Sequence, residues 1–491
     1  MDRARGRGRR GRLPRLRSRP LRHRCAPDPR RRTADPLTPA PALPKAIGRL
    51  ALTGLVLNSV IGSSVFGLPS VIGGQLGRAS PWAWAAAGLG MVLLVASFAE
   101  VASRFTRAGG TYLYARVAFG RFAGIEMAWL TYLVRLTAAA TNANLFIIYL
   151  AEFWPRATGP VESRVLLAIV LLPLAAANYR GVRGGVSTST TFAVAKLLPL
   201  ALFVATGLVA MGSGALDGSP PAVQAGAGTW LEAILLLVFA YGGFESALLP
   251  LGEARDPRRD APVALFTALG LCALLYVLVQ VVVIAALADP AASDRPLAAA
   301  AQVFLGPLGA GLMAAGALIS VYGYLAAAMV NVPRLTYAMA AEGDLPPRLG
   351  AVHPRFRTPH VSVLAFAATV WAFAAAGSFI QNLSLSAVSR LLTYGAVCVA
   401  LVVLRRRENV REDGVGEARF RVPAGEVVAA LGLLFSAVLA LRMNLRELAV
   451  LAGTLAAGVV HWLWMRPREG GWADGRTGGT AGRRNGGTAE H

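Results

Sequence analysis

Charged residues, cysteine and histidine are scarce in this chain. Asp, Glu, Lys and Arg make up 15% of its 491 residues, whereas 55% are hydrophobic. So much apolar surface cannot be hidden in the core of a globular domain, which excludes an ordinary soluble protein. The three cysteines and five histidines are scattered, and no H-E-x-x-H motif or carboxylate cluster is present. The sequence therefore predicts no enzyme, no cofactor and no metal site.

The net charge of +23 lies mainly in the tails and in alternate loops. Membrane orientation explains this placement, because Lys and Arg collect in cytoplasmic loops. We therefore expect a lipid bilayer, and no nucleic acid, as the partner. Residues 1–46, rich in Arg and Pro, and the Gly-rich residues 467–491 are predicted to be disordered cytoplasmic tails. For the first tail, contact with anionic lipid is the sharper alternative.

Apolar runs long enough to cross roughly 30 Å of hydrocarbon number about twelve. Their loops alternate between basic and poor in Lys and Arg, which predicts that both termini are cytoplasmic. A short interfacial helix is expected over 108–120 and a short surface helix over 298–305. The predicted spans are 50–76, 81–102, 122–153, 165–178, 189–211, 230–253, 263–287, 309–340, 361–376, 385–404, 425–441 and 448–465.

Two of these runs contain helix breakers near the middle of the bilayer. The first carries Gly62-Ser63-Ser64 and the sixth carries Gly242-Gly243. An unpaired backbone N–H or C=O there costs several kcal/mol, roughly, unless it faces protein or water. The glycines could merely permit close helix packing. Two breaks in corresponding halves, however, are typical of a transporter with inverted repeats.

Six motifs in sequence order resemble the amino acid–polyamine–organocation superfamily of permeases. They include I-G-S-S-V-F-G-L-P at 61–69 and F-A-Y-G-G-F-E at 239–245, and the others lie at 108–120, 178–183, 252–262 and 333–346. The resemblance implies an all-α integral membrane fold with a five-plus-five inverted repeat, residues 47–212 and 229–405. Helices 1 and 6 would be discontinuous, and two peripheral helices would follow over 406–466. It also implies transport of an amino acid by alternating access.

The chemistry of the two breaks suits the two charged groups of an amino acid. The N-terminus of a half-helix has free N–H donors and a partial positive charge, which favour a carboxylate, whereas unwound carbonyls accept hydrogen bonds from an ammonium. By resemblance, the first break would bind the carboxylate and the second the ammonium, and Phe239 would close over the substrate. Ser64 stands where the family usually has Gly. The predicted substrate-binding residues are Ile61, Gly62, Ser63, Ser64, Phe239, Ala240, Tyr241 and Gly242.

Lys196 is the only lysine inside a predicted span. An intramembrane cation costs about 2.5–3.5 kcal/mol on insertion scales and is a functional candidate by default. In several related permeases, a lysine at the similar place occupies the room of a coupling sodium ion. Since burial disfavours its charged form, we expect Lys196 to couple transport to protons. The alternative is a fixed structural cation in a sodium-independent exchanger.

Other polar residues in the predicted spans are candidates for the pocket or for an ion pair. Arg135 lies too deep for easy snorkelling and needs an acidic partner, for which Glu100 and Glu245 are available. For the uncharged residues, an interhelical hydrogen bond is the alternative role. The full set is Arg135, Asn142, Glu245, Ser320, Tyr322 and Ser389.

These features predict a proton-coupled symporter of neutral amino acids in the cell membrane, either a monomer or a homodimer. A neutral substrate is favoured because the pocket gains no obvious acid beyond Glu245. A sodium-independent exchanger and a transporter of cationic amino acids or polyamines are the alternatives. A more remote alternative is a non-transporting amino acid sensor, which would be expected to carry an ordered signalling domain.

Overall fold

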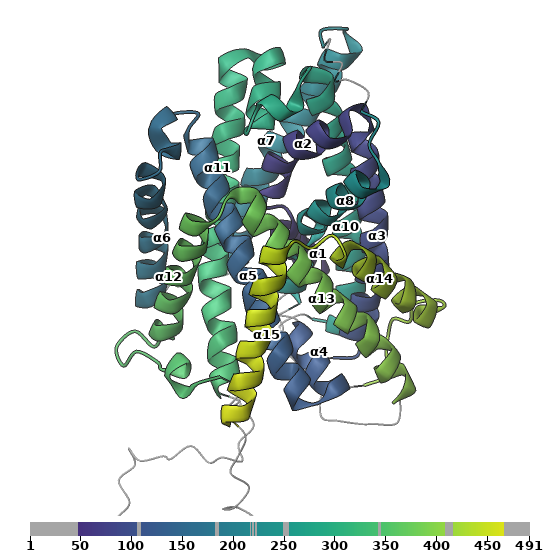
Figure 1. Ribbon diagram of the computed structural model, residues 1–491, viewed down its shortest axis with the longest axis vertical. Helices are drawn as coiled ribbons and strands as arrows, with labels where there is room; N and C mark the ends of the chain where they lie inside the picture. Colours follow the sequence, from purple (N-terminus) through teal and green to yellow (C-terminus); the bar gives the residue numbers. More distant parts are fainter. Residues whose placement is uncertain are drawn as a thin grey trace, which may run out of the picture. The chain divides into compact units, whose positions relative to one another are not determined.

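The chain folds into a bundle of helices in the computed structural model (Figure 1). The structure describes residues 48–105, 110–181, 186–216, 218, 220, 223–248, 255–341, 345–407 and 416–465. No β-strand forms among these residues. The two predicted disordered tails, 1–46 and 467–491, lie outside the described residues.

The helices follow the predicted spans because each apolar run must satisfy its own backbone hydrogen bonds in lipid. The first half of the chain contains α1 (Arg49–Val60), α2 (Ser64–Leu76), α3 (Ser80–Ala102), α4 (Gly110–Phe119), α5 (Arg121–Leu150), α6 (Glu162–Arg180) and α7 (Val186–Gly212). The second half contains α8 (Ala227–Tyr241), α9 (Phe244–Ala247), α10 (Pro257–Ala286), α11 (Pro296–Ala341), α12 (His360–Ala376), α13 (Phe379–Arg406), α14 (Gly425–Ala440) and α15 (Leu445–Met465).

Within the described part of the chain, eight helices are long and apolar enough to cross a membrane, by length and composition. Four shorter apolar helices accompany them, among them α1, α12 and α14. The chain is therefore a multi-pass membrane protein. The total of twelve spans stays a prediction.

Helices α5 and α13 form the centre of the bundle and pack against each other. In their most apolar windows 78% and 72% of the residues are buried, against 22% in α6 and in α15. Peripheral α6 packs on α12 and exposes Ile169 and Leu172 on its outer side. An exposed aliphatic face on a membrane helix is the face that contacts lipid.

The short helix predicted over 298–305 is present as the first part of α11. Gly306 has left-handed backbone angles (φ 68°, ψ −163°) and separates this part from the remainder of α11. Its alanine face is buried, since Ala298, Ala300 and Ala301 are at most 1% exposed, whereas Val303 on the other face is 54% exposed. The small alanine face lets the helix lie against the bundle, where Phe304 contacts the ring of Phe203 on α7.

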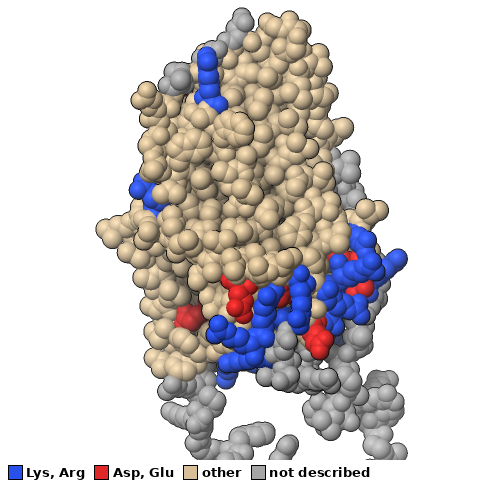
Figure 2. Space-filling model, turned by 90° about the vertical axis from the view of Figure 1, so that its right-hand side faces the viewer, with Lys and Arg blue, Asp and Glu red and all other residues tan. Residues whose placement is uncertain are grey.

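Basic side chains gather near one end of the bundle, as Figure 2 shows. This is the end at which α3, α13 and α15 finish in Figure 1. The surface farther along the bundle carries few charges in the same view. Such an asymmetry is typical of a cytoplasmic face next to an uncharged lipid-facing belt.

Candidate functional site

The first break separates α1 from α2. Helix α1 ends at Val60, Ile61 is extended (φ −75°, ψ 99°), and α2 begins at Ser64. Ile61, Ser63 and Ser64 are at most 1% exposed. The first N–H groups of a helix have no intrahelical acceptor. The N-terminus of α2 therefore brings unpaired donors and a partial positive charge to a buried place.

The second break separates α8 from α9. Gly242 is extended (φ −78°, ψ 169°), and its N–H donates to the carbonyls of Val238 and Phe239. Gly243 is left-handed (φ 110°), and a Cβ there would overlap the carbonyl oxygen of Ser59. Only glycine meets both conditions. The end of α1 can therefore lie directly against this break.

The two breaks share one buried region. The hydroxyl of Tyr276 on α10 lies 3.3 Å from both the Val60 and the Ala240 carbonyl oxygens, one at each break. A Cβ added to Gly62 would lie 3.6 Å from Oδ1 of Asn142 on α5 and 3.8 Å from the ring of Tyr324 on α11. The unwound segments thus face the same space, which α5, α10 and α11 surround.

Lys196 belongs to α7, and its side chain lies against the C-terminal end of α1. Its Nζ donates to the carbonyls of Asn58 and Ile61, at 2.7 Å each, and the residue is 1% exposed. The end of a helix carries a partial negative charge, which favours a cation there. Among the described residues, no carboxylate lies within ion-pair distance of Lys196. Main-chain carbonyls are therefore its acceptors.

Glu245 lies at the second break and binds four groups. Its Oε1 is 3.6 Å from an Arg135 nitrogen and 3.7 Å from an Arg390 nitrogen. Its Oε2 accepts from the Tyr394 hydroxyl at 2.9 Å and from the Gly243 N–H at 2.8 Å. Of the two acids proposed as partners of Arg135, the structure therefore pairs it with Glu245.

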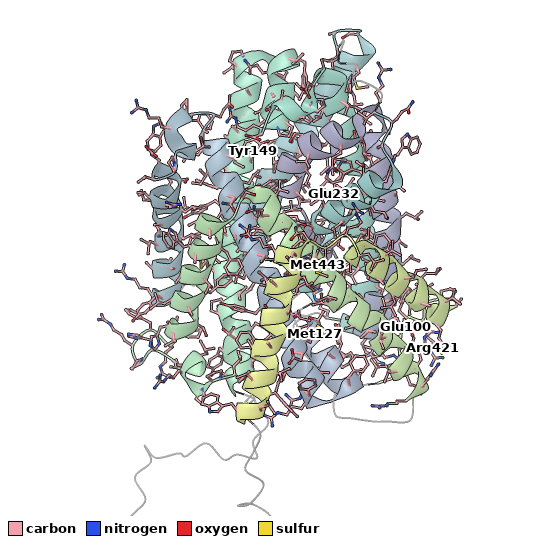
Figure 3. The ribbon with its side chains drawn as sticks, viewed as in Figure 1. Glu100, Met127, Tyr149, Glu232, Arg421 and Met443 are labelled. Atoms are coloured by element: carbon pink, nitrogen blue, oxygen red, sulfur yellow. The ribbon has the colours of Figure 1, made fainter. Side chains whose placement is uncertain are left out.

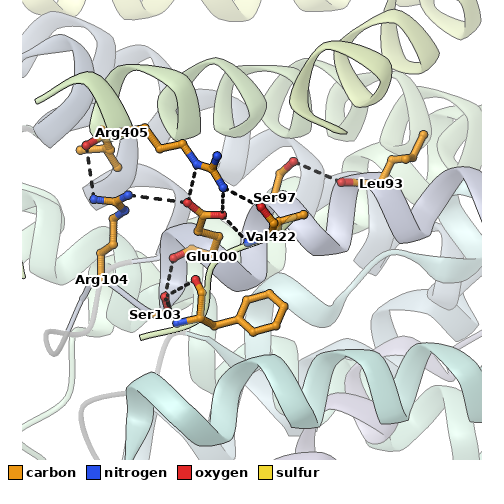
Figure 4. A network of polar contacts seen from close by, with 9 residues as sticks. Leu93, Ser97, Glu100, Ser103, Arg104, Arg405 and Val422 are labelled. Atoms are coloured by element: carbon orange, nitrogen blue, oxygen red, sulfur yellow. Dashed lines mark hydrogen bonds and ion pairs between the residues drawn. The ribbon is translucent and has the colours of Figure 1, made fainter. Parts of the chain in front are cut away.

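Glu100, the other proposed partner, belongs to a separate network near the lower end of the bundle (Figures 3 and 4). Both of its oxygens accept from Arg405 on α13, at 2.7 and 2.6 Å. One oxygen also accepts from the Val422 N–H at 2.8 Å, and Arg104 lies 3.6 Å away. This network ties the end of α3 to α13 and to the segment before α14.

Sequence reasoning missed Arg390 of α13. Its guanidinium lies 5.3 Å from the centroid of the Phe239 ring, a cation–π contact, and fills the space that a side chain at Gly242 would need. The residue is 2% exposed. An arginine within the apolar run 385–404 is itself the signal that could have found it, since intramembrane charges mark functional sites.

The remaining predicted residues lie in different surroundings. Asn142 faces Gly62, and Ser320 is 1% exposed. Ser389 donates to the Leu385 carbonyl of its own helix. Tyr322 is 37% exposed, so the structure does not support its place in the pocket. Tyr324 faces the breaks instead, because two residues turn an α-helix by about 200°.

Tyr149 is a second polar contact of the first break that sequence reasoning missed. It lies in the upper part of α5 (Figure 3), and its hydroxyl donates to the Phe66 carbonyl of α2 at 2.7 Å. Gln280 on α10 likewise donates its side-chain amide to the Pro69 carbonyl of α2, at 3.2 Å. Side chains therefore take part in satisfying the backbone of α2.

A small cavity adjoins the two breaks. It has a volume of about 50 Å³, and its lining includes Ser59, Arg135, Ser246, Tyr324 and Asn331. A buried water needs at least about 10–15 Å³ of such volume, so the cavity has room for a few waters. In this conformation the cavity is therefore much smaller than the roughly 300–1,000 Å³ that is typical of a ligand pocket.

Comparison with known proteins identifies the family. Residues 47–462 match the family model described as amino acid permease. The chain belongs to the amino acid permease family. The match runs from the start of α1 into α15, and the relatives are transporters rather than enzymes.

Three relatives illustrate what the permease is similar to. An uncharacterized transporter of Mycobacterium tuberculosis is 31% identical over 450 residues, which cover 87% of this chain and 93% of the relative. The serine/threonine exchanger SteT of Bacillus subtilis is 27% identical over 65% of this chain and 74% of its own. The branched-chain amino acid permease BcaP of the same organism is 23% identical over 82% and 89%.

Proposed function

We propose that the permease is a secondary transporter that moves neutral amino acids by alternating access, coupled to protons. The observation that carries this proposal is the meeting of two interrupted helices in one buried region, bridged by Tyr276. A half-helix N-terminus and unwound carbonyls there offer opposite partial charges to one small zwitterion.

The substrate carboxylate would bind the N–H groups of Gly62, Ser63 and Ser64. These residues begin α2, where the helix dipole favours an anion. The substrate ammonium would bind carbonyls at the end of α8, from Phe239 to Tyr241. One of these carbonyls already accepts from Gly242 and another from Tyr276. A carbonyl has two lone pairs, so each can still accept from an ammonium.

The buried charges next to the site favour a neutral over a cationic substrate. Glu245 is the one carboxylate that faces Arg135 and Arg390 among the described residues, so this cluster carries an excess of one positive charge. Lys196 is a further buried cation at the first break. A cationic side chain entering a weakly screened site of this sign would be repelled.

We further propose that the two breaks are related by the inverted repeat of residues 47–212 and 229–405. In support, α1 packs against α9 while α2 packs against α8. Two antiparallel copies of one broken helix would cross in this way. The basic end of the bundle in Figure 2 would face the cytoplasm and hold both termini.

Lys196 would take the place of a coupling metal cation. It donates to two main-chain carbonyls of the first break, the kind of ligand that an alkali cation would also use. Loss of its proton would remove the positive charge from the end of α1 while leaving N–H donors. The charge state of Lys196 would then bias the contacts of α1, and through them the opening of the site.

Sodium-independent exchange of neutral amino acids is the second candidate. It is favoured by the relative named a serine/threonine exchanger and by the hydrogen bonds that hold Lys196. In this case Lys196 would keep its proton throughout the cycle. Exchange then requires a substrate on each side of the membrane, whereas symport requires a proton gradient.

Proteoliposomes that contain the purified chain would test the proposal. We expect uptake and counterflow of serine, leucine or another neutral amino acid without sodium, and none of arginine or putrescine. Accumulation under an imposed pH gradient would indicate symport, and uptake only into preloaded vesicles would indicate exchange. Binding of amino acids without uptake or counterflow would instead indicate a sensor and refute the proposal.

A further inference from the structure

A second cavity lies away from the helix breaks, between the end of α6, the later part of α11 and the segment before α12. Its volume is about 390 Å³. Four of its lining residues are arginines: Arg180, Arg334, Arg355 and Arg357. Its apolar lining includes Met329, Pro333 and Val363, which are buried. The proposed transport of amino acids makes no use of this cavity.

The arginines of the cavity have no acidic partner in the described part of the chain. None of the four forms an ion pair with a described carboxylate, and all four are exposed. Four like charges around one hollow repel each other and create a strong positive potential. The planar guanidinium is suited to binding phosphate oxygens in pairs. The lining therefore points to a phosphate-containing anion.

The segment that carries two of the arginines is held in a defined conformation. Thr358 donates its hydroxyl to the Tyr179 carbonyl of α6 at 2.6 Å. The Arg357 N–H donates to the His353 carbonyl at 2.9 Å, and Arg357 itself is left-handed (φ 57°). A non-glycine residue adopts this region only at some strain. The contacts with α6 thus fix Arg355 and Arg357 at the cavity.

The cavity opens beside a face of the bundle that contacts lipid. Helix α6 ends at the cavity and α12 begins there, and the two helices pack together. On their outer sides Leu172 is 65% exposed and Leu364 is 52% exposed. These apolar surfaces lie within a few helical turns of the arginines. A phosphate held by the arginines could therefore belong to a molecule whose apolar part lies along α6 and α12.

We propose that this cavity, the arginine pocket, binds the headgroup of an anionic phospholipid from the leaflet at the basic end of the bundle. The arginines bind the phosphate, and the acyl chains lie along α6 and α12. Basic pockets between membrane helices are suited to such headgroups. A free phosphate would use the arginines alone and would gain nothing from the apolar helix faces.

Binding to the purified full-length chain in detergent would test the arginine pocket. The ligands are short-chain phosphatidylglycerol, the matching phosphatidylcholine and glycerol 3-phosphate, with native mass spectrometry as the readout. The test variant is Arg355→Gln with Arg357→Gln. The control is Arg348→Gln with Arg406→Gln, which removes two exposed charges that do not line the pocket. We expect the affinity for phosphatidylglycerol to fall about fivefold for each pocket arginine removed, since each contributes about 1 kcal/mol of binding free energy. The affinity of the control variant should equal that of the wild type.

Two results would overturn the proposal. Equal loss in the test and control variants would show a diffuse charge effect, and equal binding of glycerol 3-phosphate and phosphatidylglycerol would show a site for a soluble anion. A second variant, Arg180→Gln with Arg334→Gln, removes the same charge from α6 and α11 and leaves the 353–360 segment intact. It answers the question if the first variant does not fold, and wild-type lipid affinity in it would also refute the proposal.

Discussion

Replacement of Lys196 tests the coupling mechanism most directly. Lys196→Met keeps much of the side-chain length but removes both hydrogen bonds to the Asn58 and Ile61 carbonyls. A buried acceptor that loses its donor costs about 1–3 kcal/mol. The two carbonyls together therefore make the observed arrangement of the first break less stable by about 2–6 kcal/mol. We expect this change to slow transport by at least about tenfold, the factor that corresponds to 1.4 kcal/mol.

The assay separates proton coupling from a structural role of Lys196. Proteoliposomes would measure accumulation driven by a pH gradient and, separately, counterflow without a gradient. If Lys196 carries the proton, gradient-driven accumulation is lost in Lys196→Met while residual counterflow becomes independent of pH. If Lys196 is a fixed cation, both activities fall together and keep their pH dependence. Leu198→Ala, which changes a residue of α7 that is 69% exposed, is the control. Unchanged gradient-driven accumulation in Lys196→Met would refute the reasoning.

Three further substitutions test the contacts at the second break. Gly243→Ala should lower the thermal unfolding temperature and abolish uptake, because the added Cβ would overlap the α1 backbone at a residue with a left-handed φ. The control Gly54→Ala, which places a Cβ in open space on α1, should be tolerated. Equal unfolding temperatures of the two variants would contradict this prediction. Glu245→Gln should destabilise the protein by about 3–5 kcal/mol, since two buried arginines lose their anion, and a wild-type unfolding temperature would contradict it. Tyr276→Phe should lower the free energy of unfolding by about 1 kcal/mol and should weaken substrate binding, measured in a titration, by more than this amount. Unchanged substrate affinity would show that the hydroxyl has no part in the site.

The helix breaks could be predicted from the sequence because glycine carries the information locally. Gly243 is required at its position by one backbone angle and one close contact, and both act through its missing Cβ. The direction in which a helical side chain points is not determined by the local sequence in this way. Tyr322 and Tyr324 lie in the same apolar run, and only the rotation of α11 against its neighbours decides which of them meets Gly62.

Burial of uniform segments and pairing of charges were equally hard to predict. The four alanines at 298–301 are identical in the sequence, so composition could not show that Ala298, Ala300 and Ala301 form the face buried against the bundle. Glu100 and Glu245 are both buried, so each carboxylate needs a cationic partner. The pairing was decided by the position of Arg390 and Arg405 on α13, at different heights along the bundle. Such choices depend on contacts between distant parts of the chain.

The charged contacts of the site come from helices that are not themselves broken. Lys196 of α7 holds the first break, and Arg135 of α5 and Arg390 of α13 hold the second. Each contact joins a broken helix to a continuous one, so in the proposed alternating access the opening of the site would lengthen or replace one of these contacts. Under the proposed coupling, a change in charge at Lys196 would act first on the first break, whereas a substrate that contacts both breaks would favour the state in which both are held. Proton and amino acid would then be linked through α1, whose end touches Lys196 on one side and Gly243 on the other.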